Sequence, residues 1–177
     1  MFLNNKENNF KWNFSYLFII ILLSGCFTQK SYKEINFNKE TILIGRISET
    51  ILIEHKKTKW FNENYSKYKP DSVTMVKLIP NLTGVNFIIF GGTWCSDTRR
   101  DLPAFLSILH QLKVGSNRYD IWMLDLKKES NYINPKLYDI QYVPTILIFK
   151  DGKEIGRIIE KPQETLEMDL LKIISNP

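Results

Sequence analysis

From residue 85 onward the chain alternates between strand-like and helix-like patterns, and this alternation limits the folds that it can adopt. Residues 85–90 form an apolar run typical of a buried strand, and residues 96–112 carry Leu and Phe at helical spacing. We expect a second strand at 119–126 and a short helix at 134–140. The pattern is that of an α/β domain rather than of an all-helical or all-strand fold.

The end of the chain adds a hairpin to this pattern. Asp151-Gly152 separates two β-branched-rich runs, 145–149 and 154–159, and Asp-Gly is a strong hairpin signal. A closing helix is expected at 163–174. Strands separated by helices are expected to pair in parallel and hairpin strands antiparallel. We therefore predict a mixed sheet in the order β-α-β-α-β-β-α, with helices on both faces.

Residues 41–84 precede this pattern and are predicted to form an N-terminal α/β extension to the main domain, 85–177. Runs at 41–47 and 50–53 suggest two short strands that turn near Ser48. Aromatic residues recur at near-helical spacing within 57–68, which favours a helix packed on its own domain over a polyanion-binding surface. Asp71 is a plausible N-cap for another short helix at 72–78.

The first 40 residues are typical of an export signal followed by a tether. Lys6 and Lys11 precede an apolar run at 16–23, which is shorter than the roughly 20 residues that span a bilayer. The run ends in Leu23-Ser24-Gly25-Cys26, which resembles the lipobox of bacterial lipoproteins, where the cysteine is acylated. We predict a signal peptide at 1–25, lipidation of Cys26 and a tether at 26–40. An uncleaved anchor, or a plain signal with an incidental cysteine, is the alternative.

This N-terminus predicts a protein of the bacterial cell envelope that is lipid-anchored to a membrane and faces the periplasm or the exterior. The chain has two cysteines, and lipidation of Cys26 leaves Cys95 as the single free thiol. An intramolecular disulfide is then impossible. Because envelope compartments are oxidising, a lone thiol there is expected to be reactive, to pair with a partner, or to be buried.

Three features placed in order carry a family resemblance. Trp94-Cys95 stands at the first strand-to-helix turn, Pro103 lies inside the following helix, and Val143-Pro144-Thr145 leads into the hairpin. Together they resemble the thioredoxin superfamily over about half of the chain. The string from Gly91 to Thr98 also resembles bacterial envelope thioredoxin-like proteins in which Ser or Thr replaces the second cysteine.

The resemblance implies roles for the motif residues. Cys95 would attack a disulfide, with Pro144 cis and facing the sulfur. The substrate-binding residues would be Trp94, Val143 and Thr145, the backbone of Val143 pairing with a bound peptide.

Two departures from the family pattern bear on this chemistry. Thr98 occupies the position of the resolving cysteine, so a mixed disulfide on Cys95 would need an external thiol for its release. Ile89 occupies the position where many thioredoxins place a buried carboxylate. Both departures weaken any case for an efficient dithiol reductase.

The residues around Cys95 suggest how its charge is controlled. The N-terminus of a helix favours a thiolate. Thr98 could donate a hydroxyl hydrogen bond to the sulfur, and Arg99 lies on the same helical face. Asp97 opposes the thiolate, unless Arg99 or Arg100 pairs with it or it caps the helix.

Other kinds of site are disfavoured. His110 lies 15 residues after Cys95 in one predicted helix, about 22 Å away at 1.5 Å per residue, so it cannot activate the thiol. One thiol and two scattered histidines give no metal site, and we expect no cofactor. The formal net charge of +5 is mild and no basic block is visible, so we expect no nucleic-acid partner.

We therefore predict a membrane-anchored thiol-disulfide exchange protein that acts through Cys95. Its partners would be protein or peptide thiols and disulfides, together with an external reductant or redox protein. The alternative is a non-catalytic lipoprotein that binds peptides or acts as a scaffold through the thioredoxin groove. Cys95 could also be buried and inert, and a thiol peroxidase ranks last because Gly92 stands where peroxiredoxins have threonine.

Overall fold

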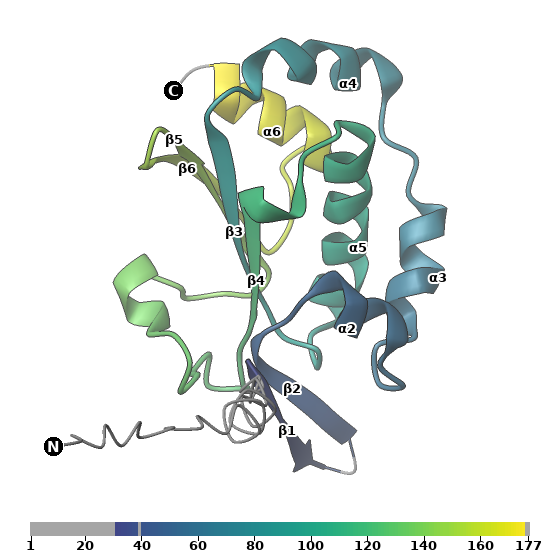
Figure 1. Ribbon diagram of the computed structural model, residues 1–177, viewed down its shortest axis with the longest axis vertical. Coiled ribbons are helices and arrows are strands. Elements are labelled where there is room, and N and C mark those ends of the chain that lie inside the picture. The colour runs from purple at the N-terminus through teal and green to yellow at the C-terminus, as the bar shows by residue number, and fades with distance from the viewer. Residues whose placement is uncertain (1–30, 39, 176–177) are drawn as a thin grey trace, which may run out of the picture. The chain divides into compact units, whose positions relative to one another are not determined.

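A six-stranded mixed sheet forms the centre of the computed structural model, which describes residues 31–38 and 40–175 (Figure 1). The strand order across the sheet is β1-β2-β4-β3-β5-β6. Only β3 and β4 pair in parallel; every other neighbouring pair is antiparallel. The strands are β1 (Tyr32–Phe37), β2 (Glu40–Arg46), β3 (Val85–Gly91), β4 (Tyr119–Met123), β5 (Thr145–Lys150) and β6 (Lys153–Ile159).

The α-helices that the structure describes all contribute side chains to one core cluster, on one face of the sheet. They are α2 (Glu49–Glu54), α3 (Trp60–Lys67), α4 (Ser72–Leu78), α5 (Ser96–Gln111) and α6 (Leu166–Ser175). Short 3₁₀ turns are η2 (Ile79–Asn81), η3 (Ser116–Arg118) and η4 (Pro135–Tyr138). The opposite face of the sheet is covered by the segment 124–144, which contains η4 and is green in Figure 1.

Successive side chains of β3 point to opposite faces of the sheet, and each face has its own core cluster. Phe87 and Ile89 face the helical layer and pack in the larger cluster, which also holds Phe105 of α5. Phe90 faces the other way and packs with Leu124 and the side chains of the smaller cluster. The motif at 94–98 follows shortly after this strand, whose side chains pack in both clusters.

The predicted α/β fold with a mixed sheet is confirmed. The hairpin is also where Asp151-Gly152 placed it: Asp151 has φ 51° and Gly152 φ 81°, the left-handed pair that a two-residue turn matched to strand twist requires. Asp71 caps α4, its carboxylate accepting the N–H of Thr74 at 2.7 Å. Hydrogen bonding from the side chain of Thr74, and then from its backbone N–H, lowers the pKa of Asp71 below its usual value.

The predicted parallel pairing is wrong for β5. Leu124 donates its N–H to Gly91 O, and Thr145 is paired with Phe90. The segment between them therefore starts and ends near the C-terminal end of β3. The strand β5 must then run back antiparallel to β3. The helix predicted at 134–140 is only the turn η4, because Asp139 adopts φ 51° and ends it.

Two predictions in the N-terminal region are also wrong. Residues 50–53 lie in the helix α2, because Ser48 caps it by accepting the N–H of Ile51 and Leu52 packs in the core. The predicted tether 26–40 extends too far, because residues 32–37 form β1 on the edge of β2. Gly45 allows this close approach, since a Cβ there would lie 2.4 Å from the carbonyl oxygen of Ser31. Cys26 and the predicted signal peptide at 1–25 lie outside the described residues.

The described part of the extension shares one core with the rest of the domain. Buried Glu167 of α6 accepts the Tyr68 hydroxyl and, at 2.9 Å, the N–H of Asp71. Burial and the bond to Glu167 raise the pKa of Tyr68 well above its usual value. The described residues on the two sides of the predicted boundary near residue 84 therefore pack together in one compact unit.

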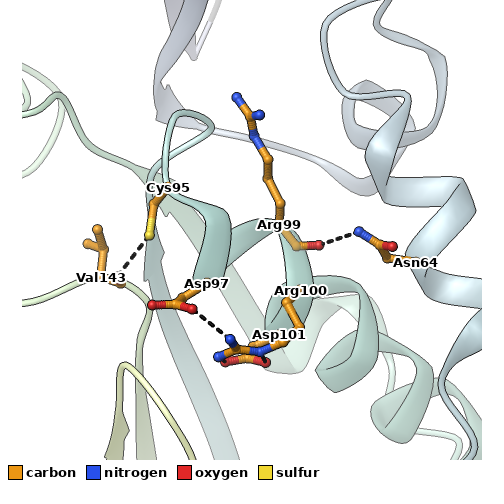
Figure 2. A network of polar contacts seen from close by, with 7 residues as sticks. All are labelled: Asn64, Cys95, Asp97, Arg99, Arg100, Asp101 and Val143. Carbon is orange, nitrogen blue, oxygen red and sulfur yellow. Dashed lines mark hydrogen bonds and ion pairs between the residues drawn. The ribbon is translucent and has the colours of Figure 1, made fainter.

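A side chain of α3 donates a hydrogen bond to a backbone carbonyl oxygen of α5 that lacks its helical partner. Pro103 lies inside α5 and has no N–H, so the carbonyl oxygen of Arg99 lacks its helical partner. The Nδ2 of Asn64 donates to this oxygen at 2.9 Å (Figure 2). An unpaired buried carbonyl costs free energy, so Asn64 stabilises the helix that contains Pro103.

We predict that Asn64→Ala lowers the free energy of unfolding by about 1 kcal/mol, the scale of one net hydrogen bond, as measured by denaturant titration. Lys67→Ala, at the exposed end of α3, is the control and should change little. In a Pro103→Ala background the N–H of residue 103 is present again and can pair with the Arg99 carbonyl oxygen. Asn64→Ala should then lower the free energy of unfolding by a smaller amount. Equal costs in both backgrounds would show that Asn64 acts in another way.

Candidate functional site

The motif forms a tight turn between β3 and α5. Cys95 is the N-cap residue of α5, with φ −85° and ψ 127°. Its N–H donates to Gly92 O at 2.9 Å, and its carbonyl oxygen accepts the N–H of Arg99 at 3.1 Å. The thiol therefore sits at the end of a 16-residue helix, where unpaired N–H groups favour negative charge.

The sulfur of Cys95 lies against the loop that precedes β5. Its Sγ is 3.2 Å from the carbonyl oxygen of Val143, to which it donates (Figure 2), and the Val143-Pro144 peptide bond is cis. Cys95 is half-buried, so the sulfur is neither sealed in the core nor fully exposed. Val143 itself is buried. The predicted proximity of the cysteine and the proline loop is present.

Trp94 and Thr145 support this loop rather than lying open. The indole Nε1 of Trp94 donates to Leu124 O at 3.0 Å, which ties the turn to the end of β4. The Thr145 hydroxyl donates to Tyr142 O at 2.7 Å, and its side chain is buried. Trp94 stays partly exposed and can contact a ligand, whereas Thr145 shapes the loop from within.

Thr98 has a partner other than the one expected. Its hydroxyl oxygen accepts the N–H of Gly92 at 3.1 Å, and the residue is fully buried. Within the described ranges, no hydrogen bond joins Thr98 to Cys95. The side chain instead fixes the turn from behind, and Gly91 has no room for a Cβ, which would lie 2.7 Å from the Cγ2 of Thr98.

Arg99 holds the turn from outside. Its Nε donates to Thr93 O at 2.7 Å, and its Nη2 lies 3.3 Å from the carboxylate of Glu40 in β2. Figure 2 shows the guanidinium pointing away from the sulfur of Cys95. The predicted electrostatic role of Arg99 is therefore replaced by a positioning role.

Arg100 is the partner of Asp97, which resolves the alternatives left open by the sequence. Its Nη1 lies 2.6 Å from the Asp97 carboxylate, and its Nε and Nη2 bind Asp101 at 2.6 and 2.7 Å (Figure 2). The hydrogen bonds that Arg100 donates to Asp101, with the nearby negative charge of Asp97, raise the pKa of Arg100 above its usual value. The negative charge beside the thiol is thus paired.

Sequence reasoning missed the residues that reach the turn from the extension. The hydroxyl of buried Thr93 accepts the N–H of Leu43 in β2 at 3.1 Å. This contact, with Glu40 and Asn64, spans sequence separations of 35 to 59 residues. A single sequence contains no local signal for such pairs.

Other chemistry is not assembled around Cys95. The position expected for a buried carboxylate holds Ile89, which is 1% exposed. The ring of His110 is bound by Tyr65 at 2.7 Å and Glu49 at 3.0 Å, at the far end of α5. Among the residues that the structure describes, no group of three His, Cys, Asp or Glu side chains could hold a metal ion. None of the helices described is long and apolar enough to cross a membrane.

Comparisons with known proteins point to one family. The sequence pattern of the Thioredoxin family matches residues 71–172. Thioredoxins from Staphylococcus aureus strains MW2 and N315 are 28% identical over 86 residues, which cover 48% of this chain and 77% of each thioredoxin.

Solved structures give a weaker likeness. Oxidised mitochondrial thioredoxin 3 from Saccharomyces cerevisiae is 21% identical, with a TM-score of 0.37, and the match covers 64% of this chain and 99% of that one. A Pseudomonas aeruginosa protein of unknown function is 14% identical, with a TM-score of 0.42, over 68% of this chain and 75% of that one. The family match, which spans more than half of the sequence and contains both Cys95 and Pro144, shows that the chain belongs to the thioredoxin family.

Proposed function

We propose that this protein exchanges thiols and disulfides through Cys95 alone and depends on an external thiol to complete each cycle. The observation that carries this proposal is the half-buried Sγ at the start of α5, 3.2 Å from the carbonyl oxygen of Val143. Position 98 holds a buried threonine, and among the described residues Cys95 is the only thiol, so none of them can resolve a mixed disulfide. Membership of the thioredoxin family supports redox chemistry on thiols and disulfides.

The exchange has two balanced steps. The Cys95 thiolate attacks one sulfur of a partner disulfide, so a Cys95–S bond forms, the partner S–S bond breaks, and the other sulfur leaves as a thiolate. An external thiolate then attacks the partner sulfur of the mixed disulfide, and Cys95 leaves as a thiolate. The external thiol is joined to the partner sulfur, and a second external thiol can reduce that bond.

Two features of the turn support a nucleophilic sulfur. The N-terminus of α5 favours negative charge at Cys95. Arg100 pairs with Asp97, which removes most of the repulsion that a carboxylate two residues away would exert on a thiolate. Neither effect needs a histidine base.

Trapping in intact cells tests the function. We expect non-reducing gels to show disulfide-linked adducts with the wild-type protein and none with Cys95→Ser, because a serine oxygen cannot form a mixed disulfide. Cys26→Ser, which keeps Cys95, is the matched control and should retain the adducts. Absence of adducts in the wild type, with partner capture unchanged in Cys95→Ser, would instead favour a peptide-binding scaffold.

Arg100 gives a second test in which the sulfur is kept. Arg100→Met should slow alkylation of Cys95 by iodoacetamide at pH 7 by roughly threefold or more, because the freed Asp97 charge disfavours the thiolate. The double variant Arg100→Met/Asp97→Asn should recover the wild-type rate. A loss that persists in the double variant would indicate a structural effect of Arg100 instead.

We also propose that the mature protein is attached to the envelope membrane by lipid on Cys26. The support is the sequence Leu23-Ser24-Gly25-Cys26 after a short apolar run. Cells fed a clickable fatty acid should label the wild-type protein and leave Cys26→Ser unlabelled, while Cys95→Ser should label normally. Labelling of Cys26→Ser at the wild-type level would overturn this assignment.

A further inference from the structure

A polar groove lies beside the active-site loop, on the face of the sheet opposite α5. It has a volume of about 620 Å³ and lies within the segment 124–144. Its charged lining consists of Lys127, Lys128 and Lys136 against the single acid Glu129. Side-chain amides of Asn131 and Asn134 add hydrogen-bond donors.

The three lysines have no acidic partners in the structure. Across residues 31–38 and 40–175, no salt bridge involves the ammonium group of any of them. The nearby carboxylate of Asp125 is engaged by the backbone, accepting the N–H groups of Lys127 and Glu129 at 2.9 and 2.8 Å. The lining itself carries three lysines against one glutamate, so its net charge is positive.

Both ends of the groove segment are tied to the reactive turn. At its start, Leu124 accepts the indole N–H of Trp94. Near its end, Ile140 lines the groove and packs in the same cluster as Val143, against which Cys95 also packs. A chain that reaches Cys95 along the Val143 loop can thus continue into the groove.

Exposed apolar side chains near the groove favour a polypeptide over a small anion as its ligand. Leu137 is 80% exposed and Tyr142 is 52% exposed, and both belong to the segment that forms the groove and the active-site loop. A small anion would leave these side chains uncovered, whereas a polypeptide can cover them while its acidic residues meet the lysines.

We propose that the groove selects partner proteins that carry acidic residues beside the cysteine exchanged at Cys95. This inference rests on the proposed function and adds the charge of the substrate to it. The lysines act by attraction during docking, so their effect should be on the rate of exchange and should weaken as salt screens the charges.

The test uses the full chain with Cys26→Ser, in nonionic detergent, so that Cys95 is the only thiol. Peptides with a central cysteine joined to thiopyridine carry either Asp or Lys on both sides. Attack by Cys95 forms the mixed disulfide and releases thiopyridone, whose absorbance gives the rate. Neutral dithiodipyridine measures the reactivity of Cys95 without a peptide.

We expect the Asp peptide to react at least about fivefold faster than the Lys peptide at low salt, and the ratio to approach one at about 1 M salt. Lys127→Gln/Lys128→Gln/Lys136→Gln should abolish the ratio but keep the rate with dithiodipyridine. Lys77→Gln/Lys113→Gln/Lys153→Gln removes the same charge at the opposite end of the sheet and should keep the ratio. Thermal unfolding would verify that both triple variants fold.

Equal rates for the two peptides with the wild-type lysines, or a ratio unchanged by the groove substitutions, would overturn the proposal. No reaction with dithiodipyridine would instead overturn the proposed function. Binding of fluorescent peptides in which serine replaces the cysteine, measured by anisotropy, tests the groove separately. Tighter binding of the Asp peptide that is lost only in the groove variant supports it, and equal binding rejects it.

Discussion

Pro103 leaves a carbonyl oxygen without a partner in the middle of the helix that carries the thiol, and the N-terminal region supplies the donor. Asn64 reaches that oxygen, on Arg99, from α3 at 2.9 Å. The side chain of the same Arg99 holds the turn at Thr93 and reaches Glu40 in β2. Arg99 therefore joins α5, the turn that carries Cys95, and the elements α3 and β2. The extension is best understood as part of the scaffold that holds the turn, because burying this part of α5 without it would leave backbone groups unpaired.

Thr98 has a structural role in the turn. The side chain is fully buried and holds Gly92 N–H, while the hydroxyl of Thr93 holds Leu43 N–H on the other side of the turn. Two threonines thus fix the turn from two sides, and neither hydroxyl is bonded to the sulfur. The position that would carry a resolving cysteine has become a structural contact. The half-buried Cys95 remains the one described sulfur placed between the helix N-terminus and the loop at Val143.

Local signals in the sequence were sufficient for the main domain and insufficient for the contacts that complete it. The hairpin at Asp151 and the buried strand before the motif depend on neighbouring residues, and both were predicted. The strand expected at 50–53 failed because the β-branched residues there form α2 under the cap of Ser48, where burial of Leu52 overrides propensity. At the site, Arg100 faces Asp97 because residues three apart lie on one side of a helix, whereas Arg99 is only two residues away. Asn64 could not be found, since its partner is a backbone atom 35 residues away.

The charges around the thiol divide into paired and unpaired groups, and this division connects the two proposals. The acids on the first turns of α5 are engaged by Arg100, while Arg99 is engaged by Glu40 and a carbonyl oxygen. These groups largely cancel near the sulfur. The lining of the groove carries three lysines against one glutamate, so an approaching partner meets a net positive charge there. A positive field beside the turn attracts an acidic chain. Attraction during docking gives a single-cysteine site a way to react faster with the partners that it binds.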